Sequence, residues 1–273
     1  CMYCYNIMCR QEGIMSIHPS SIIHPLSKID ADVEIGPFCT IGEDVEIASG
    51  TKIISHAVIK GPTKIGKNNL IYQFTTIGDD TPDKKFDGEK TRLEIGESNI
   101  FREGVTIHRG TIQDNALTSI GSNNLLMPFA HVAHDCIVGN NNIFANMAAI
   151  AGHVEVGNHV TIGGITTVHQ HCKLGDYCFA GMNSSITMDV PAFVKVASDP
   201  ARVIGINSIG MSRKDISDES ISHIKKAYKL VYRKGLKIDE AIEELKALLD
   251  SSKEHLIQTF IKSIEASERG ILR

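Results

Sequence analysis

Histidines are concentrated in one part of this chain, and they are the residues best suited to acid–base chemistry. Seven of the twelve fall between positions 108 and 171, and six of these form the group considered first, namely His108, His131, His134, His153, His169 and His171. His134 is followed directly by Asp135, and a carboxylate beside an imidazole can fix its tautomer and stabilise the imidazolium formed on proton uptake. The pair therefore favours general-base catalysis by His134. The alternative is a metal site, because neutral imidazole is the commonest zinc ligand.

A six-residue repeat determines where these histidines must lie. Stepping by six from Ile17 meets an isoleucine at every position up to Ile77, and a second run contains Ile95, Phe101 and Ile107. A third run continues from residue 120 to residue 186. β-Branched residues at this period place a stiff apolar side chain at the same point of every repeat, and the glycine that often follows permits a tight turn. Three hexapeptides close one triangular coil, so the sequence predicts a parallel β-helix whose coils stack about 4.8 Å apart.

Two interruptions of the repeat predict extruded loops. Positions 83 and 89 carry no apolar residue, so we expect a loop near 78–94 between Ile77 and Ile95. The step from Ile107 to Ile120 is seven residues too long, which predicts a second loop near 108–119. If each interruption counts as one step, the residues Ile77, Ile107, Val132, Ile150, Val168 and Ile186 lie one above another at a single corner of the prism.

The polar residues that follow this corner form the candidate site. They are Asp83, Lys85, His108, His131, His134, Asp135, Gly152, His153, His169 and Gln170. Histidines with a purely structural role would be scattered over all three corners, and folding of a β-helix edge requires none. Their concentration on one edge therefore predicts a functional site there. The His134-Asp135 pair and the two loops favour base catalysis, so we assign no metal.

The rest of the chain predicts a second, helical unit and excludes several classes of protein. We assign residues 15–200 to an all-β domain, the parallel β-helix, and residues 201–273 to an α-helical domain. Helices are expected at 217–234, 238–250 and 253–267. Residues 1–14 lie outside the repeat and are expected to be a leader without function. The net charge of −4 argues against binding of nucleic acid. No apolar run is long enough for a transmembrane segment, and the seven cysteines lack metal-ligand spacing, as expected for reduced thiols of a cytoplasmic protein.

Several motifs resemble one known family. The segments are TIHRGT (106–111), NLLMPFAHVAHDCIVGN (124–140), AGHVEVG (151–157), VHQ (168–170) and AYKLVYRKG (227–235). Together they are similar to the UDP-N-acetylglucosamine O-acyltransferases, over about residues 15–273. The pairing of an AHxAHD motif with GxTIHRGT separates that family from other hexapeptide-repeat acyltransferases. The resemblance also implies that the coils wind left-handed, against the usual right-handed preference of parallel crossovers.

The resemblance implies a reaction and a role for each site residue. A 3-hydroxyacyl group would pass from acyl carrier protein, whose phosphopantetheine carries it, to the 3-hydroxyl of UDP-N-acetylglucosamine, in the first step of lipid A biosynthesis. No further cofactor is expected, because a thioester is already activated. His134 would be the general base, Asp135 would orient it, and the backbone N–H of Gly152 would stabilise the oxyanion. The residues expected to bind substrate are Asp83, Lys85, His108, His131, His153, His169, Gln170, Asn207, Arg213 and Lys214.

Partners and chain-length preference also follow from the resemblance. We expect a homotrimer with the site between adjacent prisms, and an acidic carrier protein that docks on the basic residues of segment 217–234. Lys214 stands where the family has arginine, so its phosphate contact would be a point charge and not a bidentate fork. Met182 stands where the family has glycine or a larger residue. We expect it to limit the acyl chain to fewer than 14 carbons.

Three other readings remain open from the sequence. A metal-dependent β-helix enzyme similar to the γ-class carbonic anhydrases would use the same histidines as ligands. The UDP-3-O-acylglucosamine N-acyltransferases of the same pathway carry an additional domain ahead of their β-helix, whereas the repeats here begin at Ile17. A non-enzymatic scaffold or ice-binding β-helix would present a regular threonine-rich face, whereas this chain gathers His, Asp and Lys on one edge.

Overall fold

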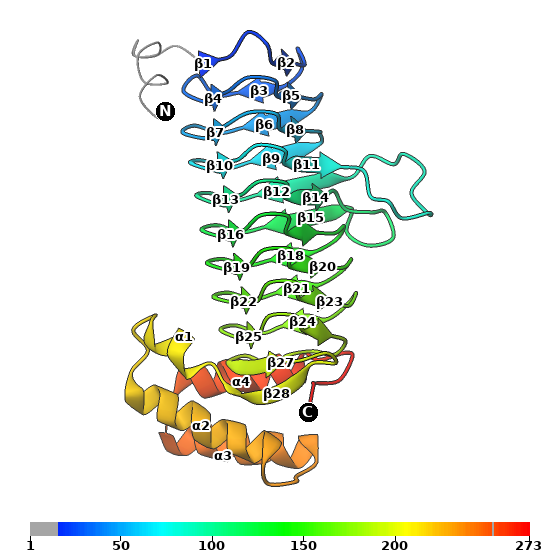
Figure 1. Cartoon of the computed structure of the whole chain (residues 1–273). Helices are drawn as coiled ribbons and strands as arrows, with labels where there is room; N and C mark the ends of the chain where they lie inside the picture. Colours follow the sequence, from blue (N-terminus) through cyan, green and yellow to red (C-terminus); the bar gives the residue numbers. More distant parts are fainter. Residues whose placement is uncertain (1–15, 253) are drawn as a thin grey trace.

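Three parallel sheets of short strands form a triangular prism in the computed structural model, and four helices cover one end of it (Figure 1). The structure describes residues 16–252 and 254–273, so the predicted leader 1–14 lies outside the described part. Sheet A consists, in spatial order, of β1 (Ser16–Ile17), β4 (Glu34–Ile35), β7 (Lys52–Ile53), β10 (Leu70–Ile71), β13 (Ile100–Phe101), β16 (Leu125–Leu126), β19 (Ile143–Phe144), β22 (Thr161–Ile162), β25 (Phe179–Ala180), β27 (Val194–Ala197) and β28 (Arg202–Ile206).

The other two sheets complete each coil. Sheet B consists of β2 (Ile22–Ile23), β5 (Thr40–Ile41), β8 (Val58–Ile59), β11 (Thr76–Asp79), β14 (Thr106–His108), β17 (His131–Val132), β20 (Ala149–Ile150), β23 (Thr167–Val168) and β26 (Ser185–Ile186). Sheet C consists of β3 (Lys28–Ile29), β6 (Val45–Ile47), β9 (Thr63–Ile65), β12 (Arg92–Ile95), β15 (Leu117–Ile120), β18 (Ile137–Val138), β21 (Glu155–Val156) and β24 (Lys173–Leu174). The predicted β-helix is thus confirmed.

The repeated apolar residues form the core, as the period predicts. Ile17, Ile35, Ile53 and Ile71 pair successively across sheet A, each eighteen residues after the last. The anchors of the later coils are buried. Ile17 and its two neighbours in the first coil are only partly buried, because the described residues contain no coil beyond them. Burial of a stiff β-branched side chain at every corner explains how a chain with only 5% aromatic residues fills its interior.

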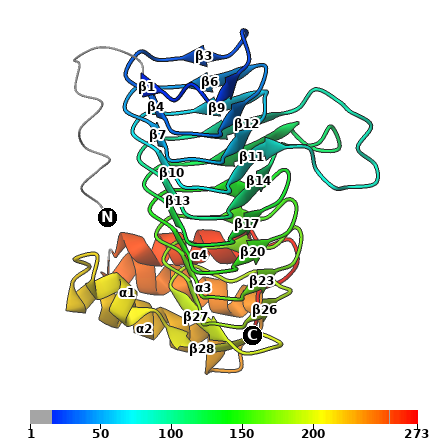
Figure 2. The same ribbon diagram turned by 45° about the horizontal axis from the view of Figure 1, so that its top comes forward.

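Both predicted loops leave the same edge of the prism (Figures 1 and 2). The anchor residues on either side of them stay in register, apart from a bulge between Ile77 and Asp79 at the root of the first loop. Ile77 pairs with Ile107 across sheet B, and Ile95 pairs with Ile120 across sheet C. Each interruption therefore counts as one step, as expected. The strands run slightly further than the sequence indicates, so the segments outside strands are 80–91 and 109–116.

The three corners of the prism differ in chemistry. We call the turn between sheets B and C the histidine corner, because it carries His134, His153 and His171. The asparagine corner, between sheets C and A, carries a buried column of Asn69, Asn99, Asn124 and Asn142. The apolar corner, between sheets A and B, carries a row of side chains that are more than half exposed: Phe38, Phe74, Phe129, Met147, Ile165 and Met182.

The C-terminal unit begins later than the sequence indicates. β27 and β28 form an antiparallel pair that extends sheet A to Ile206, so the change from strand to helix comes at Ser208 and not at residue 201. The short helix α1 (Ser208–Ser212) was not predicted. The three expected helices are α2 (Asp218–Tyr232), α3 (Ile238–Ser252) and α4 (His255–Glu265).

Local signals explain where the longest of these helices starts. The side chain of Ser217 accepts a hydrogen bond from the backbone N–H of Ser220 and so caps α2. Asp218 and Glu219 lie in its first turn, where carboxylates interact favourably with the helix dipole. Across the described ranges, no helix combines the length and apolar character that a membrane span requires.

Candidate active site

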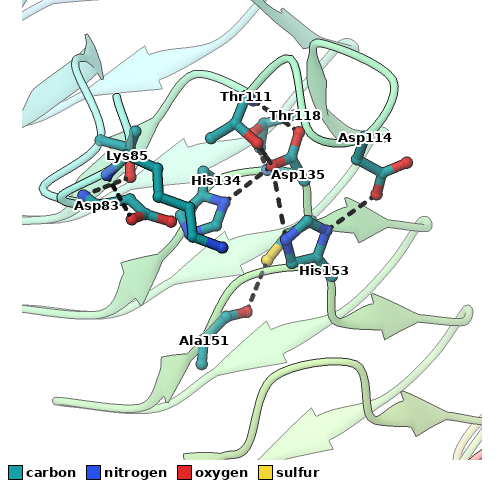
Figure 3. A network of polar contacts seen from close by, with 11 residues as sticks. Asp83, Lys85, Thr111, Asp114, Thr118, His134, Asp135, Ala151 and His153 are labelled. Carbon is teal, nitrogen blue, oxygen red and sulfur yellow. Dashed lines mark hydrogen bonds and ion pairs between the residues drawn. The ribbon is translucent and has the colours of Figure 1, made fainter. Parts of the chain in front are cut away.

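His134 and Asp135 form a hydrogen-bonded pair at the histidine corner (Figure 3). Nδ1 of His134 lies 2.8 Å from Oδ2 of Asp135. When Nδ1 carries the proton and donates to the carboxylate, the lone pair of the neutral ring is on Nε2. Within the described residues Nε2 of His134 has no hydrogen-bond partner, so the sequence-predicted base has a nitrogen available for a substrate.

Two threonines that the sequence reasoning did not identify hold Asp135 in place. Thr111, at the start of the second loop, donates to this carboxylate from its backbone N–H at 2.7 Å and from its hydroxyl at 2.6 Å. The backbone N–H of Asp135 donates to the hydroxyl of Thr118 at 2.8 Å. Burial by itself would raise the pKa of Asp135, but the hydrogen bonds from His134 and Thr111 outweigh it and lower the pKa. Asp135 is therefore ionised and immobile.

Gly152, one coil further along, lies directly against the imidazole of His134. A Cβ atom at Gly152 would come within 2.5 Å of Cε1 and 2.7 Å of Nε2 of that ring. Real Cβ atoms do not approach so closely, so only glycine leaves the ring in this position. Within the described chain, the backbone N–H of Gly152 has no hydrogen-bond acceptor, so it can donate to a group bound beside His134.

His153 completes the cluster. Its ring lies edge-on to His134, with centroids 5.1 Å apart, and is stacked on His171 at 4.4 Å. Nδ1 of His153 lies 2.9 Å from Oδ2 of Asp114 in the second loop, and Nε2 lies 3.9 Å from Oδ2 of Asp135. His171 is mostly exposed, but the pKa of its ring is lowered because neighbouring atoms remove part of it from water and because His153 lies beside it.

The same residues include a set that could approach a metal ion. Ligand atoms of His134, Asp135 and His153 lie within 4.8 Å of one another. Binding of an ion there would require His134 and Asp135 to exchange their mutual hydrogen bond for metal bonds, on a carboxylate that Thr111 already engages twice. The hydrogen-bonding pattern thus favours the base function over the ligand function.

His108 and His131 line the outer face of sheet B next to the pair. Their rings are 5.0 Å apart and edge-on, and Nδ1 of His131 is hydrogen-bonded to the hydroxyl of Thr106 at 2.7 Å. Burial, reinforced by His108, lowers the pKa of His131 to about 4, and burial also lowers the pKa of His108. Both rings are therefore neutral near pH 7 and can accept or donate hydrogen bonds without adding charge.

Asp83 and Lys85 project from the first loop over the same corner (Figure 3). The carboxylate of Asp83 accepts a hydrogen bond from the backbone N–H of Lys85 at 3.0 Å. Arg109, which is buried, donates to the backbone O of Gly78 and pairs with Asp80. It thereby attaches the base of the first loop to the start of the second.

Comparison with known proteins shows the family of this chain. Residues 189–272 match the family model described as Udp N-acetylglucosamine O-acyltransferase, Domain 2, and residues 117–152 match that of the bacterial transferase hexapeptide. The acyl-[acyl-carrier-protein]–UDP-N-acetylglucosamine O-acyltransferase of Saccharophagus degradans is 52% identical over 94% of this chain and 99% of its own length. The enzyme of the same name from a Psychrobacter species is 53% identical over the same shares. This chain belongs to the UDP-N-acetylglucosamine O-acyltransferase family.

A solved structure of the family supports the assignment over the whole fold. The crystal structure of UDP-N-acetylglucosamine O-acyltransferase from Moraxella catarrhalis superimposes with a TM-score of 0.92 at 45% identity, covering 95% of this chain and all of the other. The β-helix and the C-terminal helices are therefore both features of the family.

Three residues predicted to bind substrate do not lie at the histidine corner of this chain. The amide of Asn207 caps α1 and donates to the backbone O of Tyr177 at the asparagine corner. Arg213 and Lys214 follow α1 and are exposed. By contrast, His169 and Gln170 lie in the next turn of the histidine corner and are exposed there, as the repeat predicts.

Met182 lies on a different corner from His134. β26 is three coils beyond β17 in sheet B, so about three coil steps separate Met182 from His134. Met182 belongs to the apolar corner, and the outer face of sheet B lies between the two residues.

Proposed function

We propose that this protein transfers a 3-hydroxyacyl group from acyl carrier protein to the 3-hydroxyl of UDP-N-acetylglucosamine, the first step of lipid A biosynthesis in the cytoplasm. The observation that carries the proposal is the His134–Asp135 pair. Among the described residues, Nε2 of His134 has no partner, and it lies beside Gly152, whose N–H also has none. Two relatives that are more than half identical to this chain bear the name of that activity.

In this mechanism His134 acts as base and then as acid. Nε2 of His134 removes the proton of the sugar hydroxyl as its oxygen attacks the thioester carbon, and the ionised Asp135 stabilises the imidazolium. The resulting oxyanion accepts a hydrogen bond from the N–H of Gly152. When the tetrahedral intermediate collapses, the C–S bond breaks and His134 returns its proton to the departing thiolate of phosphopantetheine. The neutral residues His108 and His131, with Asp83, Lys85, His153, His169 and Gln170, bind the nucleotide sugar.

The apolar corner supports a homotrimer. Monomeric proteins rarely expose a continuous apolar row of this length. The rings of Phe38, His56 and Phe74 follow one another along it, tilted against each other, with centroids 5.0 and 5.4 Å apart. We propose that two further copies cover this row. Assembly would also bring Asn207, Arg213 and Lys214 of one subunit to the histidine corner of its neighbour, where they would contact nucleotide and phosphopantetheine.

A basic helix face supports docking of the acidic carrier protein. A groove of about 450 Å³ lies along α2 and the residues after it. Its lining consists of three lysines, one carboxylate and three apolar residues: Lys226, Lys229, Lys234, Glu244, Leu230, Ala247 and Leu248. Lys225 and Arg233 extend the exposed positive charge. Cations around a small apolar floor suit an acidic helix that carries a few apolar side chains.

Replacement of His134 tests the proposed reaction. His134→Ala should lower kcat by about 10³-fold, the contribution of a general base, in an assay with hydroxyacyl carrier protein and UDP-N-acetylglucosamine. His18→Ala, an exposed histidine of the first coil, should retain full activity. Activity of His134→Ala close to that of the unmodified protein would contradict the mechanism, and one tightly bound zinc per site would favour a metal enzyme.

Replacement of an apolar-corner residue tests the assembly. Phe129→Asp should convert the trimer to monomers in sedimentation experiments, because it places a charge in the proposed interface. Ile137→Asp is the matched control, since Ile137 is also exposed but lies on the outer face of sheet C. Equal sedimentation of the two variants would argue against this interface.

A further inference from the structure

Two residues of the second loop contact the site, and only one of them touches the His134–Asp135 pair. Thr111 engages Asp135, as described above, whereas Asp114 at the exposed tip engages His153 across 39 residues of sequence at 2.9 Å. Side chains at loop tips seldom hold a fixed position. The question is therefore whether Asp114 is held well enough to position His153.

The backbone of the loop fixes Asp114 to the same carboxylate that orients His134. The N–H groups of Asp114 and Ala116 both donate to the backbone O of Thr111, at 3.3 and 3.0 Å. Thr111 is 2% exposed and donates both its own N–H and its hydroxyl to Asp135. The turn that carries Asp114 is therefore attached to the catalytic carboxylate itself.

The surroundings of His153 leave the orientation of its ring to Asp114. Stacking on His171, with an angle of 12° between the planes, restrains the plane of the ring but not which nitrogen faces the site. Rotation of the ring by 180° about its Cβ–Cγ bond keeps the same plane but exchanges Nδ1 for a carbon. A C–H group would then face Asp114, and the hydrogen bond would be lost. With Nδ1 on Asp114, Nε2 points to the side of Asp135 and His134.

We propose that Asp114 is a positioning residue for the acyl transfer: it holds the proton of His153 on Nδ1 and so presents Nε2 to the site as a hydrogen-bond acceptor for a hydroxyl of the sugar. This inference rests on the proposed function. Because the carboxylate of Asp114 is about a third exposed (37%), its role lies in substrate binding and not in stability of the fold.

Kinetics of two variants at this position test the proposal. Asp114→Ala should raise KM for UDP-N-acetylglucosamine about tenfold, the factor expected for one misdirected hydrogen bond. The kcat value, KM for the acyl carrier protein and the thermal midpoint should stay unchanged. Asp114→Asn should behave like the unmodified protein, because its amide oxygen accepts the same N–H. Gln113→Ala, an exposed neighbour in the loop, is the matched control.

A double variant and NMR spectroscopy test the role of Asp114 separately from the proposed acyl transfer. When Asp114→Ala is added to His153→Ala, KM should rise no further than in His153→Ala alone, because the ring that Asp114 orients is gone. Ring ¹⁵N shifts of His153 in the substrate-free protein should report a proton on Nδ1, and a proton mostly on Nε2 in Asp114→Ala. An unchanged tautomer, an additive double variant, or Asp114→Asn as impaired as Asp114→Ala would overturn the role of Asp114. The ¹⁵N result is independent of whether the sugar nucleotide is the substrate.

Discussion

The histidine corner and the asparagine corner are built on the same coil, but they use their polar side chains in opposite ways. At the asparagine corner, the amide of Asn99 donates to Asn69 and to the backbone O of Gly121, and its oxygen accepts from Asn124. These residues are at most 1% exposed, and their hydrogen bonds close on one another from coil to coil. At the histidine corner, Nε2 of His134 and the backbone N–H of Gly152 have no partner in the described chain. Polar groups that satisfy each other hold the prism together, and those left unsatisfied are available to a substrate.

Two glycine substitutions, one at each corner, should give the largest difference between the histidine corner and the asparagine corner. Gly152→Ala would push the ring of His134 aside and should lower kcat on the order of 10³-fold, as if the base were removed. Gly139→Ala creates an equally close contact, 2.6 Å to the backbone O of Gly157, but at the asparagine corner. It should lower the thermal midpoint and leave the activity of the folded protein intact. Loss of the same property in both variants would contradict the division between corners.

Removal of one amide from the asparagine column should affect stability alone. Asn99→Ala leaves its partners Asn69 and Asn124 with buried, unpaired groups and should lower the free energy of unfolding by about 3 kcal/mol. Calorimetry would measure the change, and kcat/KM at a temperature where the variant is folded should match that of the unmodified protein. A fall in kcat/KM at that temperature would show that the two corners are coupled.

The buried, neutral ring of His131, beside the histidine corner, should make the stability of the fold depend on pH. The pKa of His131 is about 4 in the folded protein and about 6.5 in the unfolded chain, so the unfolded chain binds more protons between these values. Stability is therefore lost as the pH falls through this window, by about 2 kcal/mol between pH 7.5 and pH 5. His131→Gln should flatten this dependence in thermal melts, whereas Asn99→Ala should keep it. If the thermal midpoint of His131→Gln changed with pH as steeply as that of the unmodified protein, the result would argue against a buried neutral imidazole at His131.

The apolar corner should show the smallest effect, a change of selectivity. Met182→Gly should favour 14-carbon over 12-carbon hydroxyacyl donors by about tenfold relative to the original protein, since each additional buried methylene contributes about 0.8 kcal/mol. Competition between carrier proteins loaded with 10-, 12- and 14-carbon chains would measure the change. A preference for 14 carbons while Met182 is intact would show that this residue does not limit the chain.

Almost the whole fold could be predicted from the sequence, because the apolar residues that form its core repeat every six positions. Every coil repeats the same anchor, so the buried residues, the strand register and the edge with the two loops all follow from counting. The antiparallel strand β28 and the short helix α1 lie beyond the last repeat, where the count gives no information. The capped helix α2 was predictable because Ser217 and the acidic residues after it are local signals.

The candidate site was predictable only in part. The repeat gave the edge that carries His134, Asp135 and Gly152, but the contacts that orient them come from residues inside the loops. Thr111 and Asp114 follow no period, and nothing in their spacing indicates that one reaches Asp135 and the other His153. The phase within the coil would have separated the corner of Met182 from that of His134, had it been followed residue by residue.

The register that the anchor pairs keep across the two loops has a consequence for how such a protein can change. Thirty residues separate Ile77 from Ile107 and twenty-five separate Ile95 from Ile120, yet each pair is aligned as closely as pairs eighteen apart. Closure entropy grows only with the logarithm of loop length, about 0.6 kcal/mol for each doubling. The outer parts of segments 80–91 and 109–116 can therefore be lengthened, shortened or exchanged between relatives while the core stays as it is, provided that Arg109 and Thr111 keep their contacts. New acceptor specificities could be grafted at this edge without redesign of the prism.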